Sequence, residues 1–102
     1  MDPERLPDIQ IADVVIATSG RETGKLFYVL KTDGIYLNLV NGKDRTLEKP
    51  KRKKQRHVEK VLRAETRVAE KLRQGDKVLN SELRRDLAYL SQEMQSNNLG
   101  GF

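Results

Sequence analysis

Residues 13–32 read DVVIATSGRETGKLFYVLKT, a short polar loop between two apolar runs. The apolar runs, 14–17 and 26–30, are rich in the β-branched and aromatic residues that favour strands. The loop between them has Gly20 and Gly24, four positions apart, beside the cations Arg21 and Lys25. Because glycine adopts positive φ angles without steric cost, this spacing is typical of a tight turn. The stretch therefore predicts two antiparallel strands joined by a tight cationic loop.

The following residues continue the β pattern. We expect strands over 13–18, 25–32 and 35–40, a short fourth strand near 45–47 and a fifth around 55–60. Asp33-Gly34 and Asn41-Gly42 are strong hairpin signals, because both residues of each pair accept positive φ. Alternation within 35–40 gives the third strand one apolar face. Short strands joined by tight turns over about 50 residues predict a small SH3-like β-barrel.

The second half of the chain has the apolar period of helices. One stripe runs from Val61 to Leu72 and ends before Gly75, and the other covers 83–94 after a candidate N-cap at Asn80-Ser81. We expect both helices to pack on each other and on the barrel, so that the chain is α+β. The alternative is an exposed apolar seam that binds a partner helix. The predicted division is a flexible tail at 1–10, the barrel with its basic loop at 11–60, a helical hairpin at 61–95 and a flexible tail at 96–102.

Positive charge is concentrated in one segment. The chain has a formal net charge of +5, whereas residues 43–60 alone hold nine Lys/Arg and three acidic residues, a charge of +6. Localised charge of this kind is typical of a site for a polyanion. Within the segment, Pro50 interrupts regular pairing, so the run 49–56 is predicted to be a basic loop. The alternative interpretation is a solvated loop with no partner.

The glycine loop and its surroundings resemble a KOW motif. The resemblance rests on 20–25, preceded by 13–16 and followed by Tyr28-Val29, and extends through 40–43 and the basic run to His57. It covers residues 11–60, about half of the chain, and is closest to KOW-type large-subunit ribosomal proteins of archaea and eukaryotes and their short bacterial relatives. NusG-type transcription factors share the motif. One departure is that Leu26 and Phe27 stand where another glycine often follows the lysine.

The resemblance implies an SH3-like barrel that contacts structured RNA through the KOW loop and adjoining basic loops. We therefore expect a cytoplasmic protein that binds ribosomal RNA of the large subunit, as a ribosomal or ribosome-associated protein near other ribosomal proteins. The candidate RNA-binding residues are Arg21, Lys25, Lys43, Arg45, Lys49, Lys51, Arg52, Lys53, Lys54, Arg56 and His57. The alternative is a protein-interaction module of the transcription or translation machinery with secondary nucleic-acid contact. For Arg21 and Lys25 a purely structural hairpin remains open, and His57 could contact phosphate or lie at the barrel edge.

Other classes of function have no support in the sequence. Mixed loops on a barrel suit folded RNA better than duplex DNA, and no helix-turn-helix pattern is present. Stacking of bases on Phe27, Tyr28 or Tyr36 is the less favoured hypothesis, because a core without Trp needs two of these rings. With no Cys and one His, the chain offers no catalytic pair and no metal site, so we expect no enzyme, cofactor or small-molecule substrate. The absence of an apolar leader or of about 18 consecutive apolar residues favours a protein without membrane contact.

Overall fold

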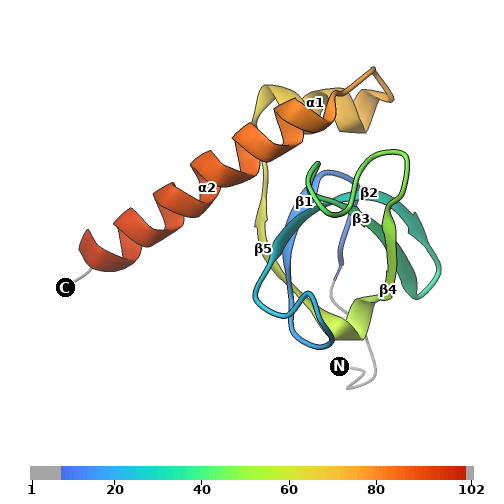
Figure 1. Cartoon of the computed structure of the whole chain (residues 1–102), viewed down its shortest axis with the longest axis horizontal. Helices are drawn as coiled ribbons and strands as arrows, with labels where there is room; N and C mark the ends of the chain where they lie inside the picture. Colours follow the sequence, from blue (N-terminus) through green and yellow to red (C-terminus); the bar gives the residue numbers. More distant parts are fainter. Residues whose placement is uncertain (1–7, 101–102) are drawn as a thin grey trace.

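The computed structural model describes the backbone of residues 8–100 and the side chains of residues 8–95. Most of the tail predicted at 1–10, and residues 101–102, lie outside the described residues. The fold is α+β, with five strands followed by two helices (Figure 1). The strands are β1 (Asp13–Ala17), β2 (Leu26–Asp33), β3 (Tyr36–Val40), β4 (Lys51–Lys54) and β5 (Val58–Arg63). A 3-10 turn, η1 (Gln55–His57), joins β4 to β5, and the helices are α1 (Arg67–Gln74) and α2 (Asn80–Gly100).

The strands form one antiparallel sheet in the order β4-β3-β2-β1-β5. The sheet is strongly curved, so that β4 and β5 come round towards each other and η1 spans the gap between them (Figure 1). Within the described residues no hydrogen-bonded ladder joins β4 to β5, and the sheet is open. The two edge strands are therefore β4, which lies within the basic run, and β5, which follows it.

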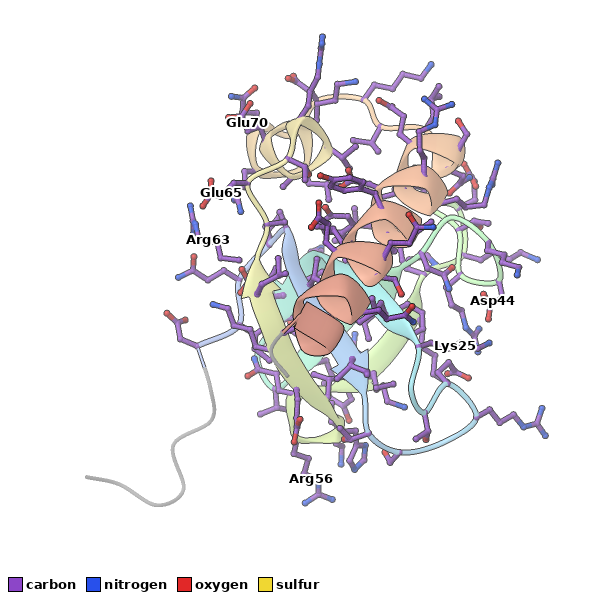
Figure 2. All side chains as sticks on the ribbon, turned by 90° about the vertical axis from the view of Figure 1, so that its left-hand side faces the viewer. Lys25, Asp44, Arg56, Arg63, Glu65 and Glu70 are labelled. Atoms are coloured by element: carbon purple, nitrogen blue, oxygen red, sulfur yellow. The ribbon has the colours of Figure 1, made fainter. Side chains whose placement is uncertain are left out.

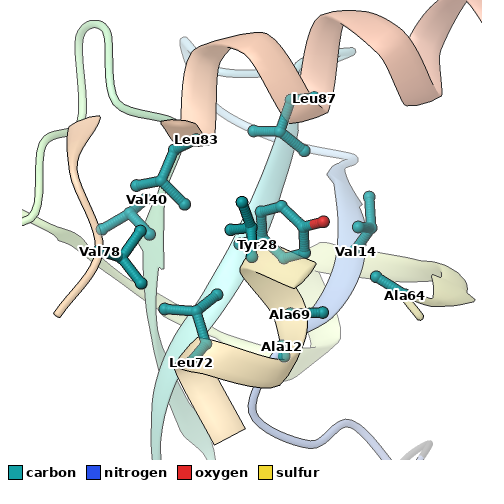
Figure 3. Close-up of a cluster of buried hydrophobic side chains, with 11 residues drawn as sticks. Ala12, Val14, Tyr28, Val40, Ala64, Ala69, Leu72, Val78, Leu83 and Leu87 are labelled. Carbon is teal, nitrogen blue, oxygen red and sulfur yellow. The ribbon is translucent and has the colours of Figure 1, made fainter. Parts of the chain in front are cut away.

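Alternation along the strands separates the buried side chains into two clusters. On one face, Val15, Phe27 and Leu39 belong to a cluster made only of the sheet and its neighbouring segments. On the other face, Val14 and Tyr28 pack with residues of both helices (Figure 3). The helices therefore cover one face of the sheet, while the other face packs on itself.

A polar contact joins β2 to both helices inside the second cluster. The Tyr28 hydroxyl, which is fully buried, lies 3.1 Å from Thr66 Oγ1 and donates a short hydrogen bond to Asp86 Oδ2. Thr66 Oγ1 also donates to Asp86 Oδ2 at 2.8 Å. Burial and the hydrogen bond to Asp86 raise the pKa of the Tyr28 hydroxyl. The contact fixes the N-terminus of α1 and the second turn of α2 on the central strand.

The first three strands confirm the prediction, with small shifts at their ends, but the predicted fourth strand is wrong. No strand covers 45–47, where the structure has only an isolated bridge between Thr46 and Lys49. The basic run itself is the fourth strand, and Leu37 and Leu39 of β3 pair with Lys53 and Lys51. Pro50 lies just before this strand and so removes no ladder hydrogen bond from it. The long apolar stems of lysine explain how the run packs beside leucines. Half of the segment predicted as a basic loop is therefore a strand.

The boundary between sheet and helices also differs from the prediction. The fifth strand begins at Val58 rather than near 55, and it continues through Val61 and Leu62, which were predicted to start a helix. Pairing of Val14 with Leu62 explains the difference, because β1 takes its second neighbour from these residues. The first helix begins instead after Thr66, whose Oγ1 accepts a hydrogen bond from Ala69 N at 3.1 Å.

The helix ends confirm part of the prediction. Gly75 ends α1 with φ of +75°, as expected for a left-handed C-cap. At the start of α2, Glu82 Oε1 accepts a hydrogen bond from Leu79 N at 2.9 Å, which is half of a capping box. The Asn80 side chain, the candidate cap, is bonded elsewhere: its Oδ1 accepts from Leu47 N at 2.9 Å. Because α2 continues to Gly100, residues 96–100 are helical and not an irregular tail.

Candidate nucleic-acid interface

The glycine loop has the tight geometry that the sequence predicts. Gly20 and Gly24 have φ of +82° and +88°, in the left-handed region that glycine occupies freely. Thr23 Oγ1 donates to Gly20 O at 2.6 Å, and Gly24 N donates to Ala17 O at 2.8 Å. These bonds close the loop on itself and on the end of β1. Arg21 and Lys25 therefore belong to a turn whose backbone is fixed by hydrogen bonds.

The loop carries a buried carboxylate that organises two cations from other segments. Glu22 is only 5% exposed. Its Oε1 lies 3.5 Å from Arg45 Nη2 and 3.8 Å from Lys51 Nζ. Residues 20–25, the loop after β3 and the start of β4 therefore meet around one negative charge. Arg45 and Lys51 keep about a third of their side-chain surface exposed, at 34% and 36%.

A second ion pair connects the same two loops on the surface. Lys25 Nζ lies 2.6 Å from Asp44 Oδ2. Asn41 Nδ2 donates to Asp44 Oδ1 at 2.9 Å, and Asn41 Oδ1 accepts from the backbone N of Lys43 and of Arg45, both at 3.0 Å. The hydrogen bonds from Lys25 and Asn41 lower the pKa of Asp44 to about 2. The turn that presents Lys43 and Arg45 is thus fixed by its own side chains.

The glycine loop, the loop after β3 and the start of β4, which these ion pairs join, carry six of the predicted cations. We call them the two-loop cluster: Arg21 and Lys25 from the glycine loop, Lys43, Arg45 and Lys49 from the loop after β3, and Lys51 at the start of β4. Arg21, Lys43 and Lys49 are exposed and form no ion pair with the described side chains. The three are the positions most available to an external anion.

Lys53 lies inside the molecule and not on its surface. Its side chain is 8% exposed, and Nζ donates to Ser19 O at 2.8 Å. A Cβ atom at Gly20 would lie 3.2 Å from the same Nζ. Lys53 therefore holds the glycine loop against β4, and the structure gives it a structural position instead of the RNA contact that the sequence predicts.

The remaining predicted residues lie along β4 and beyond it. Arg52 and Lys54 point to the opposite side of β4 from Lys51 and Lys53, as alternation in a strand requires. Arg56 is exposed and His57 half-buried in η1, and neither forms a described ion pair. Figure 2 shows Arg56 apart from Lys25 and Asp44, at the lower edge of the view. The predicted residues thus form a cluster and a line leading away from it, and not one patch.

Helix α2 adds a cation that the sequence did not indicate. Arg84 Nη1 donates to Gly42 O at 2.6 Å. Together with Lys25 and Lys43, Arg84 lines an open groove of about 630 Å³ between α2 and the two loops. Leu26 and Leu87 also line this groove. Arg84 lies in an ordinary amphipathic helix without a basic run, so no local signal distinguishes it.

Helix α2 also fixes the position of the loop after β3. A Cβ atom at Gly42 would lie 2.2 Å from Asn80 O, so the backbones of the loop and α2 are in direct contact. Asn80 Oδ1 accepts from Leu47 N, and Asn80 Nδ2 donates to Glu48 Oε1, each at 2.9 Å. The second bond lowers the pKa of Glu48. The cations of this loop are therefore presented from a fixed backbone.

The described part of the chain gives little support to other kinds of site. No three His, Asp or Glu side chains described here lie close enough together to hold a metal ion. Neither helix, over its described residues, is apolar over a length that would cross a membrane. A comparison with models of known protein families found no match, and a comparison with curated proteins found no significant match.

Proposed function

We propose that this chain is a KOW-type RNA-binding protein whose curved sheet is an SH3-like barrel, followed by a helical hairpin. Its partner would be ribosomal RNA of the large subunit, and its place the cytoplasm, on or beside the ribosome. The observation that carries the proposal is the two-loop cluster, in which two segments some twenty residues apart in the sequence bring exposed cations to one end of the sheet. The specific choice of ribosomal RNA rests on the resemblance to KOW-type ribosomal proteins.

Charge in the two-loop cluster favours a polyanion. Residues 20–25 and 41–51 together hold six Lys/Arg and three acids, a formal charge of +3. Two of the acids, Glu22 and Asp44, are already engaged by cations within the cluster. The unpaired Arg21, Lys43 and Lys49 stand outward, where each phosphate they contact would release counterions. Fixed positions reduce the entropy lost on binding, since the loops need no ordering.

The shape of the cluster suits folded RNA. Its cations come from two loops and one strand end, and Arg84 extends them across an open groove. A recognition helix for the major groove of DNA would need one face free to enter it. Here α1 and the first half of α2 bury their apolar faces on the sheet, and Arg84 is bonded to a loop. Irregular RNA can be met by shape through its phosphates and 2′-hydroxyls.

A matched pair of variants tests the proposal. Replacing Lys51–Lys54 together would disturb Glu22 and Ser19 as well as the surface, so the test uses exposed cations only. One variant changes Arg21, Lys43 and Lys49 to Gln. The control changes Arg63, Arg67 and Arg85 to Gln, which removes the same charge from exposed positions elsewhere. Arg63 lies on the opposite side of the molecule from Lys25 (Figure 2).

Filter binding of a large-subunit ribosomal RNA transcript, measured over a range of salt, gives the readout. Three lost phosphate contacts should reduce the salt slope by about 2 to 3 and the affinity at 0.15 M salt by about two orders of magnitude. The control should retain most of the wild-type affinity. Equal losses in the two variants, or no loss in the first, would show that the two-loop cluster is not the RNA site.

A further inference from the structure

We propose that Arg52, whose guanidinium lies over the ring of Tyr36, is a stacking platform for one base of the bound RNA; this inference rests on the proposed RNA-binding function. The platform lies on the outward side of β3 and β4, beside the two-loop cluster. This side of β3 and β4 would then contact a nucleobase, in addition to the phosphate contacts of the loops.

Burial excludes two of the three rings considered for stacking. Phe27 and Tyr28 are both 0% exposed, one in each hydrophobic cluster. Tyr36 is half-buried and belongs to the outward side of β3. Tyr89 is 56% exposed, but it lies on α2, which carries none of the candidate RNA-binding residues, and its hydroxyl donates to Glu93. Tyr36 is therefore the described aromatic ring best placed for an RNA contact.

The exposed side of this ring is occupied by a guanidinium. Arg52 Cζ lies 4.1 Å from the centroid of Tyr36, a cation–π distance. Arg52 Nη1 also donates to Asp33 Oδ2 at 3.2 Å, so two contacts fix the orientation of the plane. The Arg52 side chain is nevertheless 56% exposed. The guanidinium lies over the ring, and its exposed surface is available to a base, which arginine planes stack well.

The neighbours of this pair suit a nucleotide. In the register of β3 and β4, Lys54 is the direct partner of Tyr36 and shares its side of the sheet. Ile35 is 51% exposed, and together with Lys54 and Arg56 it lines a small hollow of about 120 Å³. Apolar, planar and cationic groups thus alternate along this edge. A strand of RNA leaving the two-loop cluster at Lys51 would meet Arg52, then Lys54, then Arg56.

The test separates stacking from charge. Arg52→Lys keeps the positive charge and removes the plane, whereas the control Arg56→Lys makes the same change at an exposed position without an aromatic partner. The probe is an RNA hairpin with an adenine-rich loop in which one base is 2-aminopurine. Base–arginine or base–aromatic stacking is worth enough that Arg52→Lys should weaken binding about fivefold or more. It should also reduce the quenching of 2-aminopurine on binding, while the salt slope stays unchanged.

The binding and quenching measurements decide whether Arg52 stacks on a base. If Arg52→Lys and Arg56→Lys bind and quench alike, stacking on Arg52 is excluded while RNA binding by the two-loop cluster stands. If the wild type binds this RNA without quenching at any loop position, the platform is likewise excluded. If the wild type fails to bind RNA and the Arg21, Lys43 and Lys49 variant matches it, the proposed function and the platform both fall. Thermal unfolding of each variant shows that the comparison is made between folded proteins.

Discussion

The contact between the loop after β3 and helix α2 predicts an unusually costly Gly→Ala substitution. Gly42 has φ of +77°, and a Cβ atom there would lie 2.2 Å from Asn80 O and 3.0 Å from Leu83 Cβ. The nearest atom belongs to the backbone, so it cannot move aside as a flexible side chain would. Gly42→Ala must therefore either separate the loop from α2 or shift the start of the helix.

Gly34→Ala is a matched control for the strain of the backbone alone. Gly34 has φ of +61°, but no atom lies within 4 Å of the position of its Cβ. Its replacement should cost about 1 kcal/mol, because a left-handed conformation is unfavourable for alanine by about 1–2 kcal/mol and the loss of unfolded-state freedom offsets part of this. Gly42→Ala has the same backbone term plus the clash, so we expect a loss at least about 2 kcal/mol larger than that of the control.

Urea unfolding of the wild type and both variants measures the difference directly. The m-value reports whether Gly42→Ala still exposes the same surface on unfolding, which it would not if α2 had already detached. Similar losses in the two variants would refute the close packing of the loop against α2. The claim that α2 fixes Lys43 and Arg45 in place would fall with it.

Two further predictions concern polar contacts. Tyr28→Phe should destabilise the protein by about 1–2 kcal/mol, because the buried hydroxyl bonds Asp86 and lies beside Thr66; unchanged urea unfolding would contradict this. Asp44 has its pKa lowered from 3.8 to about 2 by Lys25 and its neighbours, so the ion pair stabilises the fold above about pH 4, and this contribution is lost as the pH falls towards 2. Because both groups are more than a third exposed, the contribution should stay below about 1 kcal/mol. Asp44→Asn should be less stable than the wild type at pH 7, and the difference should shrink as the pH falls through about 2; a gap that is independent of pH would exclude the linkage.

Local signals in the sequence account for the first half of the sheet. Apolar runs on either side of Gly20 and Gly24, and the hairpin at Asp33-Gly34, predicted β1 to β3 to within one residue at each end. The fourth strand could not be found in this way. A run of four Lys/Arg has little strand preference, and it becomes β4 only because β3 offers an edge to pair with. Long-range pairing with β1 likewise takes Val61 and Leu62 from the expected helix.

The candidate site shows the same division between local and tertiary information. The sequence indicated which residues carry charge, but not which charges are already used. Glu22 looks like an ordinary loop residue and is a buried partner of Arg45. Lys53 looks like its neighbours in the basic run and is buried because alternation turns it inward. Arg84 reaches the groove only through the docking of α2.

Crosslinking in cells tests the central proposal most directly. Ultraviolet irradiation of living cells, followed by purification of the protein, sequencing of the attached RNA and mapping of the attached peptides, would identify both partners of the contact. We predict fragments of large-subunit ribosomal RNA, attached to peptides from 20–25 and 41–56. Sedimentation with ribosomes should be lost after RNase treatment. Attachment of no RNA, together with sedimentation that survives RNase, would contradict the proposal and indicate a protein-interaction module instead.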